Sequence, residues 1–232
     1  MSQIISNSVR GVLFDCDGVL VDSEPITNAV LRTMLHELGW AISAQECIEL
    51  FIGRALRDQR ELIFQHSSVW ITEDWLAEFR TRRDAQLRAQ LQAIDGAAAA
   101  VRAAADRFDS RIACATGADL GKATMQLEMT GLLPLFAGQL YSGMDQPRSK
   151  PAPDVYLAAA AGIGIDPTTA LVIEDTVSGV RAGVAAGATV LGFCPGGPVH
   201  ASSETLRAAG AQHTFSHMDQ LAELLGCLTP QQ

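Results

Sequence analysis

The stretch VRGVLFDCDGVL, residues 9–20, places an apolar run directly before two aspartates, Asp15 and Asp17. The run Val9–Phe14 is typical of a strand buried on both faces of a parallel sheet, because apolar residues dominate it without strict alternation. Two carboxylates two residues apart at a strand end repel each other unless a positive charge lies close by. A hard cation supplies that charge, and Mg²⁺ bridging to a phosphate fits best, although the pair could instead cap backbone amides.

Apolar runs of the same kind recur along the chain, separated by segments with helical periodicity. They predict strands at Ile112–Ala115, Gly138–Ser142, Ala170–Ile173 and Thr189–Phe193, and helices near Asp119–Thr130, Pro153–Ala161 and Val177–Ala186. This alternation indicates the α/β class, with a parallel Rossmann-like sheet core and helices on both faces. Ligands of open α/β sheets bind at the carboxyl ends of the strands, so the residues that follow each run are site candidates.

The segment between the first two predicted strands does not continue this alternation of strands and helices. An apolar residue recurs every four positions from Ile26 to Leu38, and Ser23 with Pro25 is a plausible helix start. Further helices are predicted near Ala44–Phe51, Arg57–Gln65 and Glu73–Leu91. We therefore expect an α/β core domain of residues 1–22 and 91–232, and an inserted α-helical cap domain of residues 23–90. A cap beside the carboxyl edge of the sheet can cover a site and exclude water.

Polar residues follow two more of the predicted strands. Glu174 and Asp175 end one of them, and Asp175 would lie beside Asp15 if the two strands are neighbours. The same acids would also suit the positive end of the next helix. Thr116 and Gly117 offer a hydroxyl and an unhindered backbone N–H to an anion, an arrangement that an ordinary helix N-cap shares.

Lys150 is one of only two lysines in the chain. It precedes Pro151-Ala152-Pro153, a rigid entry into a predicted helix at the carboxyl edge of the sheet. A solvated surface lysine is the common alternative. We interpret Lys150 as an ammonium that faces the acids and a bound phosphoryl group.

Composition limits the partners of the protein. Seventeen basic and 26 acidic residues give a net charge of −9, so a nucleic-acid partner is not expected. Five dispersed cysteines predict neither a disulfide framework nor a zinc site. The first 11 residues lack the layout of a signal peptide, and glycine and proline break the longest uncharged stretch, residues 182–203. We expect a cytoplasmic monomer with no membrane partner.

Three strings resemble the motifs of one enzyme family: DCDGVLVDSEP at residues 15–25, SKPAPDVY at 149–156 and IEDTVSGVRAG at 173–183. In this order they resemble the haloacid dehalogenase-like (HAD) hydrolase superfamily. The chain is most similar to the subfamily with a helical cap after the first strand, which includes beta-phosphoglucomutase and many sugar-phosphate phosphatases. The resemblance extends over nearly the whole chain, to about Phe193.

The resemblance implies roles for the residues at the strand ends. Asp15 would be the nucleophile that forms an aspartyl-phosphate, and Asp17 the general acid that then becomes the base. Thr116 and Lys150 would act with them on the transferring phosphoryl group, and Gly117 would contribute to substrate binding.

The resemblance also implies a metal site and a recognition loop. Mg²⁺ would be held by the carboxylate of Asp15, the backbone carbonyl of Asp17 and Asp175, with Glu174 nearby in an outer role. Arg54 lies where related caps carry a substrate-specificity loop, and is the candidate there for substrate binding.

The implied function is that of a Mg²⁺-dependent phosphatase acting on a small phosphorylated metabolite, most simply a sugar phosphate. Asp17 argues against carbon–halogen cleavage, because the dehalogenases lack a second aspartate. A phosphosugar mutase is the alternative, but Thr27 stands where beta-phosphoglucomutase has a histidine. The other alternative, a non-catalytic metabolite-binding protein, does not fit the complete set of motif residues.

Overall fold

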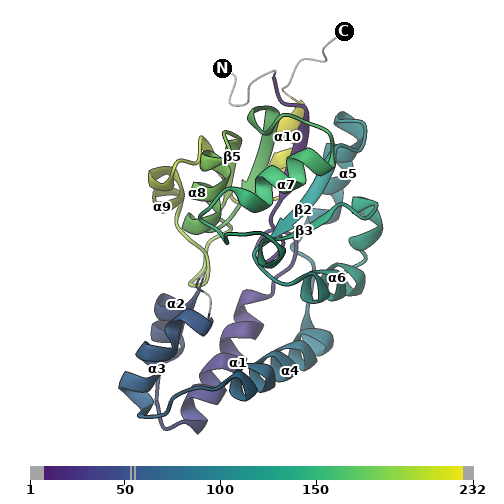
Figure 1. Ribbon diagram of the computed structural model, residues 1–232. Helices are drawn as coiled ribbons and strands as arrows, with labels where there is room; N and C mark the ends of the chain where they lie inside the picture. Colours follow the sequence, from purple (N-terminus) through teal and green to yellow (C-terminus); the bar gives the residue numbers. More distant parts are fainter. Residues whose placement is uncertain (1–7, 53, 55, 227–232) are drawn as a thin grey trace. The chain divides into compact units, whose positions relative to one another are not determined.

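The computed structural model describes residues 8–52, 54 and 56–226. Residues 1–7, which begin the stretch without a signal-peptide layout, and Cys227 therefore lie outside the described residues. Contacts within the chain divide it into two compact units (Figure 1). We call them the helical unit, Asp22–Gln92, and the sheet unit, Met1–Val21 with Ala93–Gln232.

The sheet unit contains a parallel sheet of six strands, counted over the described residues, in the order β3-β2-β1-β4-β5-β6. The strands are β1 Gly11–Phe14, β2 Ile112–Thr116, β3 Leu140–Ser142, β4 Ala170–Glu174, β5 Thr189–Phe193 and β6 His213–Phe215. Every residue of β1, β2 and β4 is buried, as expected for strands covered on both faces. The α/β prediction is confirmed.

Helices cover both faces of this sheet. They are α5 Ala97–Arg107, α6 Leu120–Met129, α7 Asp154–Gly162, α8 Val177–Ala185, α9 Ser203–Ala209 and α10 Asp219–Gly226, with short 3₁₀ helices η2 Leu133–Phe136, η3 Gly143–Asp145 and η4 Pro167–Thr169. Side chains of α7, α8 and α9 share one apolar cluster with the strands, and α5 packs against α10. Figure 1 shows α7 in front of the sheet and α10 behind it.

The helical unit has its own apolar core. Its elements are α1 Glu24–Glu37, α2 Ala44–Phe51, η1 Leu56–Gln59, α3 Arg60–Ser67 and α4 Glu73–Gln90. Val30 and Met34 of α1, from the predicted four-residue repeat, pack with Phe79 of α4 in this core. Ser23 precedes α1 as expected, but its side chain makes no capping hydrogen bond. No helix in the described part of the chain combines the length and apolarity that crossing a bilayer requires.

Some predicted boundaries differ from those of the structure. β3 starts two residues later than its apolar run, and the helix predicted near Arg57–Gln65 is the short η1 followed by α3. β6 was not predicted, because it is a three-residue edge strand that contains His213 and Thr214. Such a short polar strand has little of the apolar pattern by which strands are found in a sequence.

Candidate active site at the carboxyl edge of the sheet

The carboxyl ends of the neighbouring strands β1, β2 and β4 lie level with one another in the sheet. The register pairs Phe14 of β1 with the residues just before Ala115 of β2 and Glu174 of β4. Asp15, which follows β1, therefore lies level with Ala115 and Glu174. All three lie near the carboxyl ends of parallel strands, where ligands of this type of sheet bind.

Lys150 connects these three strands. Its Nζ donates hydrogen bonds to Asp15 Oδ1 at 2.6 Å, to Glu174 Oε1 at 2.7 Å and to the carbonyl oxygen of Ala115 at 3.0 Å. These acceptors use all three protons of an ammonium group. The Lys150 side chain is only 10% exposed, so it lies against the acids and not in solvent.

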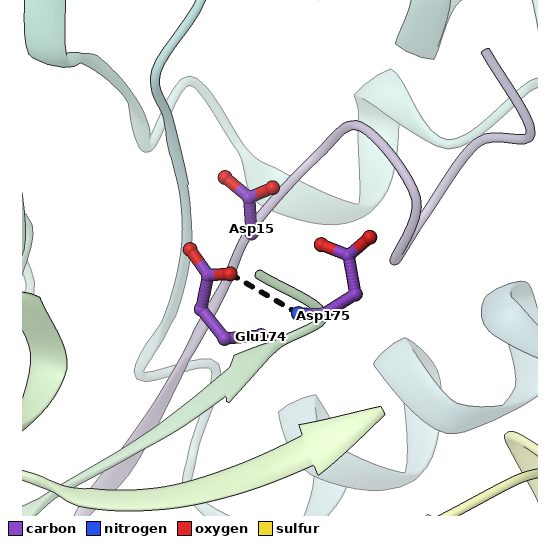
Figure 2. Close-up of side chains that lie close together, drawn as sticks. All are labelled: Asp15, Glu174 and Asp175. Atoms are coloured by element: carbon purple, nitrogen blue, oxygen red, sulfur yellow. Dashed lines mark hydrogen bonds between the residues drawn. The ribbon is translucent and has the colours of Figure 1, made fainter. Parts of the chain in front are cut away.

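The side chains of Asp15, Glu174 and Asp175 lie close together (Figure 2), and these acids and Lys150 act strongly on one another's ionisation. Burial raises the pKa of Asp15 well above its ordinary value, and the carboxylates of Glu174 and Asp175 add to the rise, against the opposing effect of Lys150. Burial acts to lower the pKa of Lys150, but Asp15 and Glu174 outweigh it, so the pKa of Lys150 is raised. Lys150 is therefore a fixed positive charge.

Glu174 is fully buried and fully hydrogen-bonded. Its Oε1 accepts from Lys150 and from the hydroxyl of Tyr156 at 2.7 Å, and its Oε2 accepts from the backbone N–H groups of Asp175 and Thr176 and from the Thr176 hydroxyl. Burial acts to raise the pKa of Glu174, but Lys150 and the other donors outweigh it and the pKa is lowered. Glu174 thus stays ionised and anchors Lys150, and it also stabilises the turn before α8.

The acidic residues have the donor chemistry of a divalent metal site. Oxygen atoms of Asp15, Glu174 and Asp175 lie within 4.8 Å of one another, and all three residues are buried. Three carboxylates against the single charge of Lys150 leave an excess of negative charge that a hard cation with oxygen ligands would offset. Gly18, with φ of +78°, allows the loop after β1 to pass beside Asp175, because a Cβ there would lie 2.1 Å from Asp175 Oδ2. The residues present therefore fit a metal such as Mg²⁺.

Asp17, the second aspartate of the loop, is held by helix α6. Lys122 Nζ lies 2.8 Å from Asp17 Oδ1 and 2.9 Å from Oδ2, and Gln126 Nε2 donates to Oδ1 at 2.9 Å. The Lys122 side chain is 8% exposed and that of Asp17 is 16% exposed. Each lysine of the chain therefore pairs with one aspartate of the first motif, Lys150 with Asp15 and Lys122 with Asp17.

Thr116 and Gly117 lie at the end of β2. Thr116 is buried, and its hydroxyl oxygen accepts a hydrogen bond from the backbone N–H of Ala118 at 3.0 Å. The N-cap alternative for Thr116 is wrong, because Asp119 caps α6 through the N–H of Lys122. A Cβ on Gly117 would meet no atom within 4 Å, so there is open space beside this backbone.

Arg54 lies in the helical unit, between α2 and η1, and it is exposed. Its backbone N–H donates to the carbonyl of Phe51 at 3.1 Å. Its contribution to substrate binding stays a prediction.

Four residues at the site were not identified from the sequence: Lys122, Gln126, Tyr156 and His200, whose Nδ1 lies 3.6 Å from Asp175 Oδ2. The four-residue spacing of Lys122 and Gln126 puts both on one face of a helix that begins just after β2. That spacing was the available signal. No pattern states which face of the helix turns toward the strand ends.

Comparison with known proteins matches most of the sequence to one family. The family model described as haloacid dehalogenase-like hydrolase matches residues 9–187. The 6-phosphogluconate phosphatase of Escherichia coli K12 is 28% identical over 220 residues, which cover 93% of this chain and 94% of that protein.

Two solved structures are similar over almost their whole length. A conserved haloacid dehalogenase-like protein of unknown function from Agrobacterium tumefaciens C58 has a TM-score of 0.81 and 31% identity, covering 95% of this chain and 99% of that one. A HAD family hydrolase from Deinococcus radiodurans R1, with bound phosphate and sodium, has a TM-score of 0.78 and 33% identity, covering 97% and 100%. The resemblance inferred from the three sequence strings is confirmed.

Proposed function

This chain belongs to the haloacid dehalogenase-like hydrolase family, and we propose that it is a Mg²⁺-dependent phosphatase that cleaves a small phosphorylated metabolite. The observation that carries this proposal is the Lys150 ammonium held between Asp15 and Glu174 at the strand ends. A sugar phosphate, or the phosphate of a sugar acid, is the proposed substrate class. The name of the E. coli relative and the phosphate bound in the D. radiodurans structure support this choice.

In the proposed first step, Asp15 is the nucleophile. Lys150 holds Asp15 Oδ1, and the other carboxylate oxygen attacks phosphorus. As the new P–O bond forms, the bond from phosphorus to the oxygen of the metabolite breaks, and that oxygen takes a proton from the carboxyl group of Asp17. The products are a free alcohol and an aspartyl-phosphate on Asp15.

In the proposed second step, Asp17 acts as the base. Its carboxylate takes a proton from a water molecule whose oxygen attacks phosphorus. The bond between phosphorus and Asp15 breaks, inorganic phosphate leaves, and Asp17 is protonated again. One water molecule is consumed for each ester that is cleaved.

The proposed metal ligands are Asp15, Asp175 and the main-chain carbonyl of Asp17. Glu174 is assigned an outer role, because five hydrogen bonds already reach its two oxygens. Bound there, Mg²⁺ supplies positive charge that stabilises the phosphoryl oxygens and keeps Asp15 ionised in spite of its burial.

The proposed contacts to the phosphoryl group come from residues at the strand ends. Lys150 would donate to a phosphoryl oxygen in place of one of its three present acceptors. Thr116 and Gly117 would bind the phosphoryl oxygens from the end of β2. Residues 23–90 are proposed as a cap that selects the metabolite, with Arg54 as the first candidate for substrate binding.

An Arg54→Ala variant tests this role by its KM, which should rise for the preferred substrate while kcat changes less.

Phosphate release from a panel of sugar phosphates, sugar-acid phosphates, nucleotides and phosphonates tests the proposal. Release should need Mg²⁺, stop in EDTA and be absent in an Asp15→Asn variant. Interconversion of phosphosugar isomers with a bisphosphate activator, and no release, would instead identify a mutase. Metabolite binding with neither reaction would identify a non-catalytic protein.

A further inference from the structure

Helix α6 holds the carboxylate of Asp17 by both of its oxygens. Lys122 donates to Oδ1 and Oδ2, and Gln126 donates to Oδ1, all between 2.8 and 2.9 Å. Gln126 is fully buried, and its Oε1 is oriented toward the Cys16 thiol at 3.9 Å, which turns its amide nitrogen toward Asp17. The orientation of Asp17 is therefore set by two side chains four residues apart on one helix.

Stability alone gives little reason for this arrangement. A largely buried pair of one lysine and one aspartate loses the hydration of both charges, and such pairs often stabilise a fold no better than apolar side chains of similar volume. A group that must first donate and then accept a proton gains more from a fixed orientation, because small displacements from the reacting atoms slow catalysis strongly.

We propose that Lys122 and Gln126 are positioning residues that orient Asp17 for both of its proton transfers. The inference rests on the proposed phosphatase function. Lys122 acts through Asp17 and does not itself contact the phosphoryl group. Without Lys122, protonation of the leaving oxygen and deprotonation of the attacking water both slow down.

The identity of the leaving group separates these two transfers. p-Nitrophenol leaves as a stable anion, so formation of the aspartyl-phosphate from p-nitrophenyl phosphate does not depend on protonation by Asp17. An alkyl phosphate, such as a sugar phosphate, requires that protonation. Hydrolysis of the aspartyl-phosphate requires Asp17 as a base whichever ester formed it.

The test is rapid mixing of a Lys122→Met variant with p-nitrophenyl phosphate and Mg²⁺. Met keeps the unbranched length of the lysine chain and removes the charge. We expect a burst approaching one p-nitrophenol per active site, followed by a steady rate about tenfold or more below that of the wild type. With the preferred sugar phosphate, kcat should fall by a similar factor, without a burst, while KM stays within about twofold.

Three further variants serve as controls. Gln126→Met removes one of the three hydrogen bonds, and should give a smaller change in the same direction. Lys122→Arg keeps a charged donor and should recover part of the lost rate. Arg102→Met removes an exposed charge from α5 and should behave as the wild type.

Several outcomes would overturn the inference. Equal losses on both esters without a burst would show a merely structural role, and a raised KM with unchanged kcat would show that Lys122 binds substrate. If Lys122→Met does not fold, the burst of Gln126→Met decides, and its absence rejects the inference. A wild type that cleaves no phosphate ester rejects the proposed function itself, a result separate from all of these.

Discussion

At the scale of single residues, Lys150 pairs with Asp15 and Glu174, and Asp175 lies close to these two acids. Burial and mutual repulsion of the carboxylates oppose the ionisation of Asp15, whereas the charge of Lys150 and several hydrogen bonds hold Glu174 ionised. The two carboxylates thus have separate tasks, because Glu174 is surrounded by hydrogen-bond donors and Asp15 lies among other acids. Asp15, the proposed nucleophile, and Glu174, which anchors Lys150, are therefore distinguished by environment.

An Asp15→Asn variant should lose all measurable phosphatase activity and keep its melting temperature. The amide cannot attack phosphorus, yet it fills the same volume and removes one of three crowded negative charges. Lys150 keeps its hydrogen bond to Glu174. Calorimetry beside a phosphate-release assay checks this, and retained activity would rule out Asp15 as the nucleophile.

A Tyr156→Phe variant should be less active and less stable by about 1 kcal/mol. It loses the 2.7 Å hydrogen bond from the Tyr156 hydroxyl to Glu174 Oε1 and keeps an aromatic ring 4.7 Å from Lys150 Nζ. We expect kcat to fall and KM to change little. Urea unfolding and steady-state kinetics measure the two effects, and an unchanged kcat would mean that Glu174 needs no help in placing Lys150.

At the scale of elements, the start of α8 packs directly against the site. A Cβ on Gly179 would lie 1.6 Å from Glu174 Oε1, a distance that forces the carboxylate to move. Gly179→Ala should therefore lower both kcat and the free energy of unfolding, the latter by about 1–3 kcal/mol.

Gly117→Ala provides the matched control for the stability effect. A Cβ there meets no atom within 4 Å, so its melting temperature should stay near that of the wild type. Both variants are compared by thermal unfolding. Equal stability of Gly179→Ala and the wild type would show that Glu174 can move at no cost.

Strands could be predicted from the sequence where the strand is buried at every position. β1, β2 and β4 are buried at every position, so their runs are apolar and stand out from the flanking polar residues. β6 at the sheet edge is only three residues long and contains half-buried polar residues, so its sequence shows no periodicity typical of a strand. The break between η1 and α3 is equally hidden, because η1 has only four residues and α3 follows it directly.

The site was predictable only as far as strand ends determine it. Asp15, Glu174 and Asp175 follow apolar runs, so their common location follows from the sheet. Lys122 and Gln126 reach Asp17 from a helix, and only the packing of that helix decides which of its faces points at the strand ends. A lysine on a helix is most often solvated, so the general tendency of lysines argues against the position beside Asp17 that the structure gives Lys122.

At the scale of the whole molecule, metal binding and folding are coupled. A cation that binds only the folded cluster stabilises the protein by about 2.7 kcal/mol at a concentration of 100 times its Kd. For a chain of this length we expect Mg²⁺ to raise the melting temperature by about 5–10 °C. An Asp175→Asn variant should lose most of this increase, and an equal increase would place the cation elsewhere.

The helical unit should be removable as a whole. Val21 pairs with Ala93 in an antiparallel bridge, and Asp22 N–H donates to the Gln92 carbonyl at 3.0 Å, so the chain leaves and re-enters at adjacent points. Joining Val21 to Ala93 through a two-residue Asn-Gly turn should leave a sheet unit that unfolds cooperatively. Circular dichroism during heating measures this, and a broad, gradual transition would show that the sheet unit depends on the helical unit.

Lys150 takes its three acceptors from segments that are far apart in the chain, at positions 15, 115 and 174. A slip of one residue in β1 or β4 would turn a carboxylate to the opposite face of the sheet and leave a buried cation with too few partners. The buried cluster of Lys150 and its acceptors therefore discriminates against mispaired sheets during folding. Recovery of activity on refolding would then report directly that the three central strands have reached their native alignment.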